Sequence, residues 1–175
     1  MDQAVATKPR GTVPLGPAAA ARLIALLLPA ALLGGALWSQ YFGGLHPCEM
    51  CYWQRWPHGA AILLAALAFT APVFSGRARM LTVLAALAIA VSGAIGVYHA
   101  GVEAKIFEGF TQCTATSSRG MSTADLLKQI THAPLIRCDQ VQWRFLGLSL
   151  AAWNAILSLG GAALILILTL RPGRR

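Results

Sequence analysis

Charged residues are scarce in this chain. Asp, Glu, Lys and Arg make up 11% of its 175 residues, whereas a soluble domain of ordinary composition carries about 25%. Acidic side chains are the scarcest, with six Asp and Glu against 14 Lys and Arg. Hydrophobic residues make up 57% of the chain. This composition argues against a soluble globular protein and indicates one that places apolar side chains in lipid.

A basic stripe interleaved with aromatic side chains is also missing. The formal net charge is +8, but the basic residues stand beside apolar runs and form no patch that would follow a phosphate backbone. We therefore predict no nucleic-acid partner and look instead to the lipid bilayer as the surroundings of the chain.

Four long apolar runs are present, and they predict an all-α membrane protein with a four-transmembrane-helix bundle. A membrane-crossing helix needs about 20 residues. The second run, 59–74, has only 16 residues, so its helix is expected to begin earlier, near Arg55. The expected spans are about 18–42, 54–74, 80–98 and 145–170. Together they form one transmembrane domain, 18–170, between a disordered tail (1–17) and a basic tail (171–175).

The basic residues predict how the bundle is oriented. Eight of them, with Asp2 as the single acid, lie in the tails, at the start of the first span and in the turn between the second and third spans. The other two loops, 43–53 and 99–144, have a balanced charge. Because basic loops stay in the cytoplasm, both termini are expected there and both balanced loops on the periplasmic side.

The long loop, 99–144, contains one predicted amphipathic helix. Ser122 is a plausible N-cap with Asp125 at the third helical position, and Met121 and Leu126 are spaced as a hydrophobic staple. Two interpretations remain open: a helix that lies on the membrane surface and a helix that packs on the top of the bundle.

All four cysteines fall in the outer loops, where an oxidising compartment permits disulfides. Of the three possible connectivities, pairing within each loop is the simplest and gives Cys48–Cys51 and Cys113–Cys138. Pro47 precedes the first pair and suits a helix start, where the helix dipole lowers a thiol pKa. A thiolate attacks disulfides, so this placement favours redox chemistry.

The second cysteine pair has two possible roles, and the cysteine spacing argues against a metal site. Cys113–Cys138 is either a structural disulfide that closes the long loop or a reactive disulfide that meets a soluble thiol partner. A structural zinc site would need both pairs at Cys-x-x-Cys spacing, which only the first has. Covalent haem would need His in place of Tyr52. We therefore predict no metal.

Arg55 and His99 are candidate binding residues for a quinone. Arg55 lies four residues after Cys51, on the same helix face. A guanidinium near the hydrocarbon is costly without a partner or a task; here the task is to polarise a quinone carbonyl, and the alternative is to bind lipid phosphate. His99, at the end of the third span, is expected at the same depth. It would hydrogen-bond a quinone oxygen or relay a proton, or else be an interfacial histidine beside Tyr98.

Residues 47–55 (PCEMCYWQR) resemble the DsbB family of disulfide bond formation proteins, in which a Cys-x-x-Cys pair is followed by arginine four positions on. Residues 96–103 (GVYHAGVE) are similar to the version in alphaproteobacterial members. Cys138, followed by Gln142-Trp143, is also similar to the family. The resemblance extends over about residues 20–170.

The resemblance implies a protein-dithiol:quinone oxidoreductase in the bacterial inner membrane, with its active site on the periplasmic side. It implies that a periplasmic DsbA-type thiol oxidase attacks the long-loop disulfide, with Cys113 forming the mixed disulfide and Cys138 as its partner. Electrons would then pass to Cys48–Cys51. Cys51 would contact the electron acceptor, ubiquinone or menaquinone, with Arg55 beside it.

Two other functions are compatible with parts of the pattern. A vitamin-K-epoxide-reductase-like membrane oxidoreductase also uses external cysteine pairs, but its Cys-x-x-Cys pair typically lies late in the chain. A non-enzymatic membrane protein with two structural disulfides would have inert cysteines and no role for Arg55. Reactivity of the cysteines with a quinone separates the non-enzymatic protein from the two oxidoreductases, and the early position of the Cys-x-x-Cys pair separates these two from each other.

Overall fold

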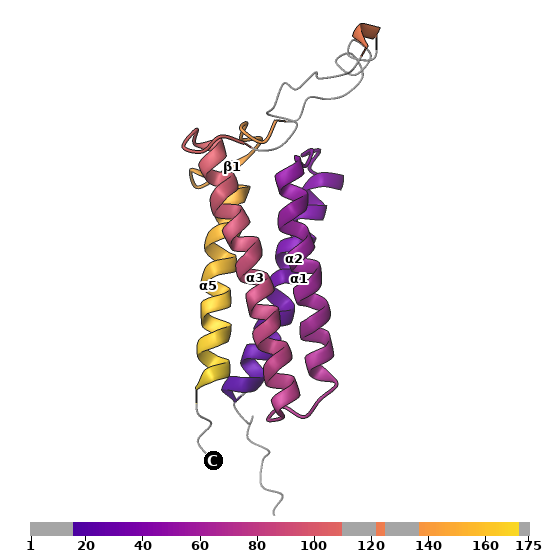
Figure 1. Cartoon of the computed structure of the whole chain (residues 1–175), viewed down its shortest axis with the longest axis vertical. Coiled ribbons are helices and arrows are strands. Elements are labelled where there is room, and N and C mark those ends of the chain that lie inside the picture. The colour runs from indigo at the N-terminus through magenta and orange to yellow at the C-terminus, as the bar shows by residue number, and fades with distance from the viewer. Residues whose placement is uncertain (1–15, 110–121, 125–136, 172–175) are drawn as a thin grey trace, which may run out of the picture.

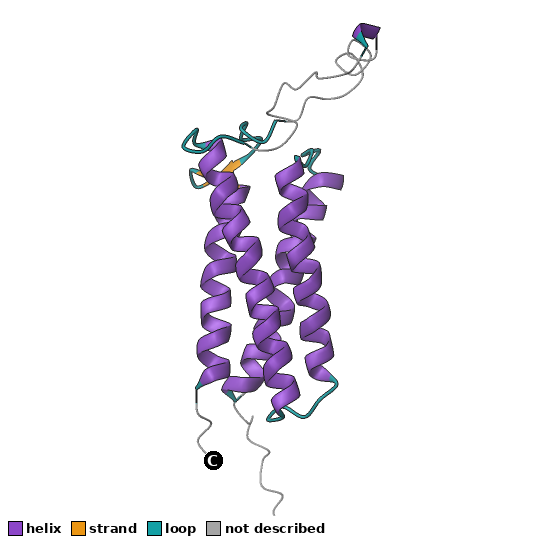
Figure 2. Ribbon diagram, in the orientation of Figure 1, coloured by secondary structure: helices purple, strands orange, loops and turns teal. Residues whose placement is uncertain are grey.

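The computed structural model describes residues 16–109, 122–124 and 137–171. Its elements are α1 (Pro17–Tyr41), α2 (Glu49–Phe69), α3 (Gly76–Glu103), β1 (Arg144–Phe145), β2 (Leu148–Ser149) and α5 (Leu150–Leu170). The four long helices stand side by side in one bundle (Figure 1, Figure 2). The most extensive contacts join α3 to α2 and to α5, and α1 packs against α2 and α5. The predicted all-helical architecture is confirmed.

Three of the four helices, α1, α3 and α5, are long and apolar enough to cross a membrane. Helix α2 has the same length as α5, 21 residues, but Gln54, Arg55 and His58 in its first half make it less apolar. The start of α1 and the end of α5 lie at the same end of the bundle (Figure 1). An even number of crossings would produce this arrangement, although the four crossings and the cytoplasmic termini stay predictions.

The helices differ in their bounds from the expected spans. Helix α2 begins at Glu49 instead of 54 and ends at Phe69 instead of 74, so residues 49–53 are helical and do not belong to a loop. Helix α3 begins at Gly76, where the Ser75 hydroxyl accepts a hydrogen bond from the Ala78 amide, and continues to Glu103. Hydropathy locates the apolar run, whereas backbone hydrogen bonds continue past it.

A short hairpin replaces the first turns of the expected fourth span. Strands β1 and β2 pair antiparallel, and Leu146 and Gly147 between them have φ values of 50° and 80°. Two successive positive φ angles are typical of the tight turn that suits a two-residue hairpin. The Ser149 hydroxyl then accepts from the Ala152 amide at 3.2 Å, and this N-cap starts α5 at Leu150, not at 145.

At the end opposite the cysteines, the helices pack through alanine. We call the following buried cluster the alanine core: Ala21, Ala25, Ala61, Ala65, Ala85, Ala86, Ile89, Ala162 and Ile165. Small side chains let helix backbones approach closely, which is how helices associate in lipid. Arg22 lies at the same end, 4% exposed, and donates hydrogen bonds to the carbonyls of Ala68 at 2.5 Å and Ala71 at 3.3 Å. It therefore ties α1 to the C-terminal turn of α2.

Three predictions fall mainly or wholly outside the described residues. Thr123 and Ala124 are helical, but the rest of the predicted loop helix, residues 125–130, is not described. Cys113 and the predicted tail before residue 16 also lie outside the described part of the chain.

Candidate redox site

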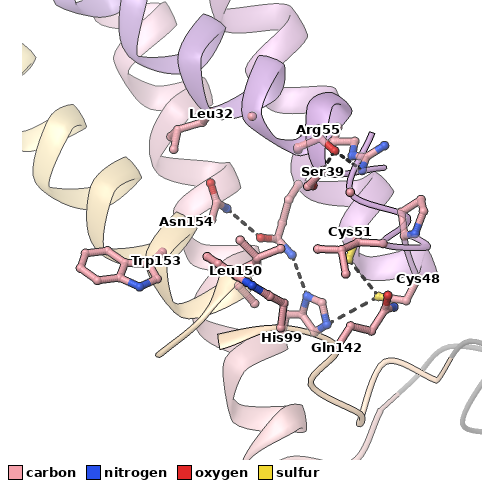
Figure 3. Close-up of a pocket in the computed structure, with 18 of the residues that line it drawn as sticks. Leu32, Ser39, Cys48, Cys51, Arg55, His99, Gln142, Leu150, Trp153 and Asn154 are labelled. Carbon is pink, nitrogen blue, oxygen red and sulfur yellow. Dashed lines mark hydrogen bonds between the residues drawn. The ribbon is translucent and has the colours of Figure 1, made fainter. Parts of the chain in front are cut away.

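Cys48 and Cys51 stand at the N-terminus of α2. Cys48 is the N-cap residue, and Cys51 lies in the first turn of the helix. Their sulfur atoms are 3.2 Å apart, compared with about 2.05 Å in a disulfide. The structure thus holds the pair as two adjacent thiols, placed so that a small movement closes the predicted disulfide (Figure 3).

The structure brings Cys138 of the long loop to the first cysteine pair. Cys138 is 1% exposed and packs in a buried cluster with Cys48, Met50 and Val102. Its side chain hydrogen-bonds to the Cys48 thiol. Sequence reasoning placed the two cysteines in separate loops and did not predict this contact.

Gln142 joins the two outer loops through two hydrogen bonds. Its amide oxygen accepts from the His46 backbone N–H at 3.0 Å, and its amide nitrogen donates to the His46 carbonyl at 2.5 Å. These two hydrogen bonds join His46, two residues before Cys48, to Gln142, four residues after Cys138. In the sequence Gln142 appeared only as part of the resemblance, with no role attached.

The environment of Cys48 differs from what its place on the helix suggests. Hydrogen bonds with Cys138 and Cys51, together with burial, raise the pKa of the Cys48 thiol. The expected lowering of the thiol pKa at the helix start is therefore not found for Cys48, whereas the hydrogen bond from the Cys48 thiol lowers the pKa of Cys51. Neighbouring sulfurs compete for the same proton, and a second thiolate beside the first would be repelled.

Asp139 anchors the segment that carries Cys138. Its carboxylate accepts hydrogen bonds from Lys105, which follows α3, and from the Arg137 guanidinium at 2.9 and 2.8 Å. These two cations hold the pKa of Asp139 well below its usual range. The carboxylate is therefore ionised at every physiological pH, and the loop remains tied to the end of α3.

A cavity of about 760 Å³ opens beside the thiols. Most of its surface is apolar and comes largely from residues of α1 and α5, but nearly half of its lining residues are polar or charged, among them Cys48, Cys51, Arg55 and His99. Figure 3 shows these side chains around the pocket. Sites for small organic ligands have this size and combine apolar walls with placed polar groups.

Arg55 lines this cavity one turn below Cys51. Its guanidinium donates to the Gln40 side-chain oxygen at 2.5 Å and to the Ala36 carbonyl at 3.3 Å, both on α1. It also lies 5.1 Å from the centre of the Tyr52 ring. Arg55 lies near the thiols, as predicted. Its contact with a quinone and the alternative role as a lipid anchor stay open at this point.

His99 is 3% exposed and touches the cysteine pair. Its Nε2 lies 3.5 Å from Cys48 Sγ, and its Nδ1 lies 2.8 Å from the Gln54 amide nitrogen. Glu103, one turn further on α3, is 3.8 Å from Nε2. His99 is therefore enclosed by the bundle, and its depth in the membrane, on which the interfacial alternative depends, is not tested. Contact of His99 with a quinone stays a prediction.

Buried polar side chains beneath His99 form a network that the sequence reasoning largely missed. Asn154 of α5 joins helices through hydrogen bonds to α2 and α3. His58 of α2 lies 2.9 Å from both Asn154 Oδ1 and Ser92 Oγ. The available signal was the presence of polar residues inside apolar runs, which in membranes rarely lack partners.

Among the described residues, one group also has the composition of a soft-metal site. Cys48, Cys51 and His99 each offer a ligand atom, and these atoms lie within 4.8 Å of one another. Thiolate and imidazole are the ligands that zinc takes. The prediction that the protein works without a metal is not tested by this geometry.

Comparison with known proteins assigns the family. Residues 18–168 match the family model described as disulfide bond formation protein DsbB. The chain belongs to the DsbB family. Disulfide bond formation protein B of Methylococcus capsulatus is 34% identical over 152 residues, which cover 83% of this chain and 90% of that protein. The protein of the same name from a Polaromonas species is 31% identical over 164 residues, 88% and 93% of the two chains.

A third DsbB relative, from Xanthomonas oryzae, is 28% identical over 142 residues, which cover 79% of this chain and 82% of that protein. No solved structure matches the chain. With three helices apolar enough to cross a membrane, this DsbB-family chain is a membrane oxidoreductase of disulfide bond formation. The match favours this family over the vitamin-K-epoxide-reductase-like alternative.

Proposed function

We propose that this DsbB-family protein is a protein-dithiol:quinone oxidoreductase of the bacterial inner membrane that reoxidises a periplasmic DsbA-type thiol oxidase. The observation that carries the proposal is the packing of Cys138 against Cys48, whose own thiol and that of Cys51 line a cavity with a mainly apolar surface. A cavity that opens beside reactive thiols within a membrane-helix bundle suits an electron acceptor dissolved in lipid.

The proposed reaction begins in the long loop. A thiolate of the reduced partner attacks the Cys113–Cys138 disulfide at Cys113, forms the mixed disulfide and releases the Cys138 thiolate. Cys138 then attacks Cys48, so that a Cys138–Cys48 bond forms, the Cys48–Cys51 bond breaks and Cys51 leaves as a thiolate. The contact between Cys138 and Cys48 supports this exchange, because no loop movement is needed to bring the sulfurs together.

The cycle closes with two further exchanges. The second thiolate of the partner attacks the mixed disulfide and leaves as part of the partner's disulfide, while Cys113 is released as a thiolate. Cys113 attacks Cys138, which re-forms Cys113–Cys138 and leaves Cys48 and Cys51 as the thiol pair seen in the structure. Oxidation of that pair to a disulfide releases two electrons and two protons.

A bound quinone, ubiquinone or menaquinone, would accept these two electrons and two protons. The cavity beside Cys51 fits a quinone ring because its walls are apolar and the Arg55 guanidinium is among its lining groups. A guanidinium stabilises negative charge on an oxygen through charge-assisted hydrogen bonds. This task, together with the single turn between Arg55 and Cys51, favours quinone binding over a lipid anchor.

Redox potentials explain why the acceptor is placed in the membrane. A DsbA-type oxidase has a potential near about −120 mV, and a glutathione pool of about −180 to −210 mV cannot reoxidise it. The relay from DsbA through DsbB to quinone is the established source of oxidising power in the bacterial periplasm. The oxidant must therefore come from outside the thiol pool, and a lipid-soluble quinone is such an oxidant.

The proposed orientation places the cysteine end on the periplasmic side, both termini in the cytoplasm and all four helices across the membrane. The two tails, the start of α1 and the turn between α2 and α3 carry most of the basic residues, as the positive-inside rule requires of cytoplasmic segments. The start of α1 and the end of α5 also lie together at the end away from the thiols (Figure 1).

A reconstitution tests the reaction. Full-length protein in lipid nanodiscs is mixed with a reduced DsbA-type oxidase and a soluble ubiquinone analogue, and quinone absorbance is followed together with the partner's thiol content. We expect one quinone reduced for each partner disulfide formed. Absence of partner-dependent quinone reduction would falsify the proposal.

A trapping experiment tests the order of the exchanges. Cys138→Ala should accumulate a mixed disulfide between Cys113 and the partner, visible on a non-reducing gel, because the thiolate that passes electrons inward is missing. In the matched control, adding Cys113→Ala should abolish the trap. A trap that instead requires Cys48 would reverse the proposed entry and exit pairs.

A further inference from the structure

Behind Cys48, polar side chains of α2, α3 and α5 join in one hydrogen-bonded chain. We propose that Gln54 and Asn154 are positioning residues that hold His99 in the neutral tautomer whose Nε2–H faces Cys48 Sγ. Through this contact they stabilise the Cys48 thiolate that leaves when Cys113 attacks Cys138. The functional part of this inference rests on the proposed thiol:quinone reaction, whereas the tautomer does not depend on it.

The assignment starts from two backbone carbonyls, which only accept hydrogen bonds. Asn154 Nδ2 lies 3.2 Å from the Ser92 carbonyl and therefore is the amide nitrogen. It lies 2.7 Å from Gln54 Oε1, which accepts. The nitrogen of the Gln54 amide lies 3.2 Å from the Met50 carbonyl, so that group is also a donor. Turning either amide over would place an amide oxygen against a carbonyl oxygen.

The orientation of Gln54 decides the state of the imidazole. Gln54 Nε2 donates to His99 Nδ1 at 2.8 Å, so Nδ1 accepts and carries no proton. In a neutral imidazole the proton is then on Nε2. This N–H lies 3.5 Å from Cys48 Sγ, a length that suits a hydrogen bond to sulfur. Nε2 also lies 3.8 Å from the Glu103 carboxylate, and the ring hydrogen-bonds to the Cys138 backbone. Figure 3 shows Asn154, His99 and Cys48 along this path, with dashed lines for the hydrogen bonds.

Further contacts hold the Asn154 amide from its other side. Asn154 Oδ1 accepts from the Ser158 hydroxyl at 3.0 Å and lies 2.9 Å from His58 Nε2. The Ser92 hydroxyl donates its proton to the Gln54 carbonyl at 2.8 Å, so its oxygen accepts the hydrogen bond from His58. The donor and acceptor assigned to each of these hydrogen bonds are consistent with one another. Because Gln54, His99 and Ser92 are more than nine-tenths buried, a reversed arrangement would bring like polar atoms together where an unpaired polar group is costly.

The direction of donation favours negative charge on Cys48. An N–H that points at Cys48 Sγ stabilises a thiolate on that sulfur, so Cys48 becomes the better leaving group. In the last exchange of the cycle, the Cys113–Cys138 bond forms, the Cys138–Cys48 bond breaks and the electron pair leaves on Cys48. No oxidant and no net proton is needed. The stability of the leaving thiolate is one of the factors that set such rates.

Nitrogen-15 NMR of the imidazoles reads the tautomer directly in the reduced full-length protein in nanodiscs, with His99→Gln used to assign the signal. We expect His99 to show a protonated Nε2 and an unprotonated Nδ1. In Asn154→Leu and Gln54→Leu the two tautomers should mix and the shifts should move toward each other. A protonated Nδ1 in the wild type, or unchanged shifts in both variants, overturns the proposal.

Kinetics test the consequence of the tautomer. In the reconstituted system, Asn154→Leu and Gln54→Leu should lower kcat by about tenfold, as for the loss of one hydrogen bond, while the KM for the ubiquinone analogue stays unchanged. Thr82→Val is the matched control, because it deletes a buried hydroxyl bond on α3 remote from the thiols. An unchanged kcat, or an equal loss in the control, contradicts the positioning role.

The two failures are distinguishable. If the wild-type protein reduces no quinone, the proposed function is wrong, and the NMR experiment still decides whether Gln54 and Asn154 set the tautomer. If the wild type is active and the variants keep both its tautomer and its kcat, only the positioning role is wrong.

Discussion

At the cysteine end of the bundle, helices α2, α3 and α5 meet through hydrogen bonds between buried polar side chains, whereas at the opposite end the same helices meet through alanine. The first region contains Gln54, His99 and Asn154 and borders the cavity. The second is the alanine core. The helices are the same, so the difference lies in which side chains stand between them.

The contrast shows how one bundle combines a rigid end with an open one. In lipid, apolar side chains gain nothing by leaving their surroundings, so close backbone approach between small residues supplies the packing energy. Alanine therefore suits the end that only has to hold the helices together. At the other end α3 and α5 still pack closely at Gly96, and the cavity is lined mainly by residues of α1, α2 and α5. Hydrogen bonds fix the positions of the groups around it.

Substitution of Cys51 by serine should have the largest effect. Cys51→Ser retains the shape of the site but removes the thiolate that the exchange releases, so quinone reduction should be lost entirely while the melting temperature stays unchanged. Quinone absorbance and thermal unfolding in nanodiscs measure the two quantities. Residual partner-dependent turnover in this variant would remove Cys51 from the pathway.

Loss of the Arg55 charge should have the second-largest effect. Arg55→Leu should raise the KM for the ubiquinone analogue by about 10- to 100-fold, since hydrogen bonds to charged groups contribute about 1.5–3 kcal/mol, and thiol exchange with the partner should continue. Arg55→Lys should recover part of the affinity. Arg77→Gln, at the other end of the bundle, is the control. Equal KM values for all three variants would favour the lipid-anchor role of Arg55.

Substitutions in the alanine core should lower the stability of the protein and leave quinone reduction intact, which is the opposite of the effect expected at the thiols. Ala65→Leu places a large side chain where Ala65 is 1% exposed and should lower the free energy of unfolding by about 1–3 kcal/mol. Ala66→Leu, at the neighbouring exposed position, should change little. Thermal unfolding measures the difference. If both variants unfold alike, the packing of this end is looser than the structure indicates.

Removal of the Asp139 charge should have the smallest effect. Because its folded pKa is depressed, its contribution is present above the unfolded pKa of about 3.9 and is lost only as the pH falls through the lower folded value. Turnover from pH 5 to 8 should therefore show no step from this group. Asp139→Asn should lower kcat by less than about threefold, as for an exposed ion pair, and added salt should reduce the difference. A step in the wild-type profile near pH 4 to 5 that Asp139→Asn removes would contradict the depressed pKa.

Much of the fold was predictable because membrane insertion depends on local composition. Apolar runs near 20 residues predicted the long helices, and all four appear; the end of α5 agrees, the bounds of α1 differ by one residue, and the other boundaries shifted by about four or five. The shift at the start of α2 matters because it places Cys51 inside the helix. Capping groups such as Ser75 and Ser149 decide these ends, and hydropathy does not register them.

The candidate site was predictable only in part. The Cys-x-x-Cys pair and the arginine four residues later are local patterns, and the helix repeat alone places Cys51 and Arg55 on one face. The contact of Cys138 with Cys48 and the clamp between Gln142 and His46 join positions about 90 residues apart. No spacing rule connects such positions, because the chain between them runs through two helices and a long loop.

The sequence by itself determined that this DsbB-family chain is a helical membrane protein with a thiol pair at the start of a helix, since these properties follow from composition and near-neighbour spacing. Only the tertiary structure decided that a third sulfur reaches the pair, that a cavity opens beside it, and that Gln54 and Asn154 orient His99. Those features arise where α2, α3 and α5 converge, and hydrogen-bond directions there are set by carbonyls that no side-chain pattern specifies.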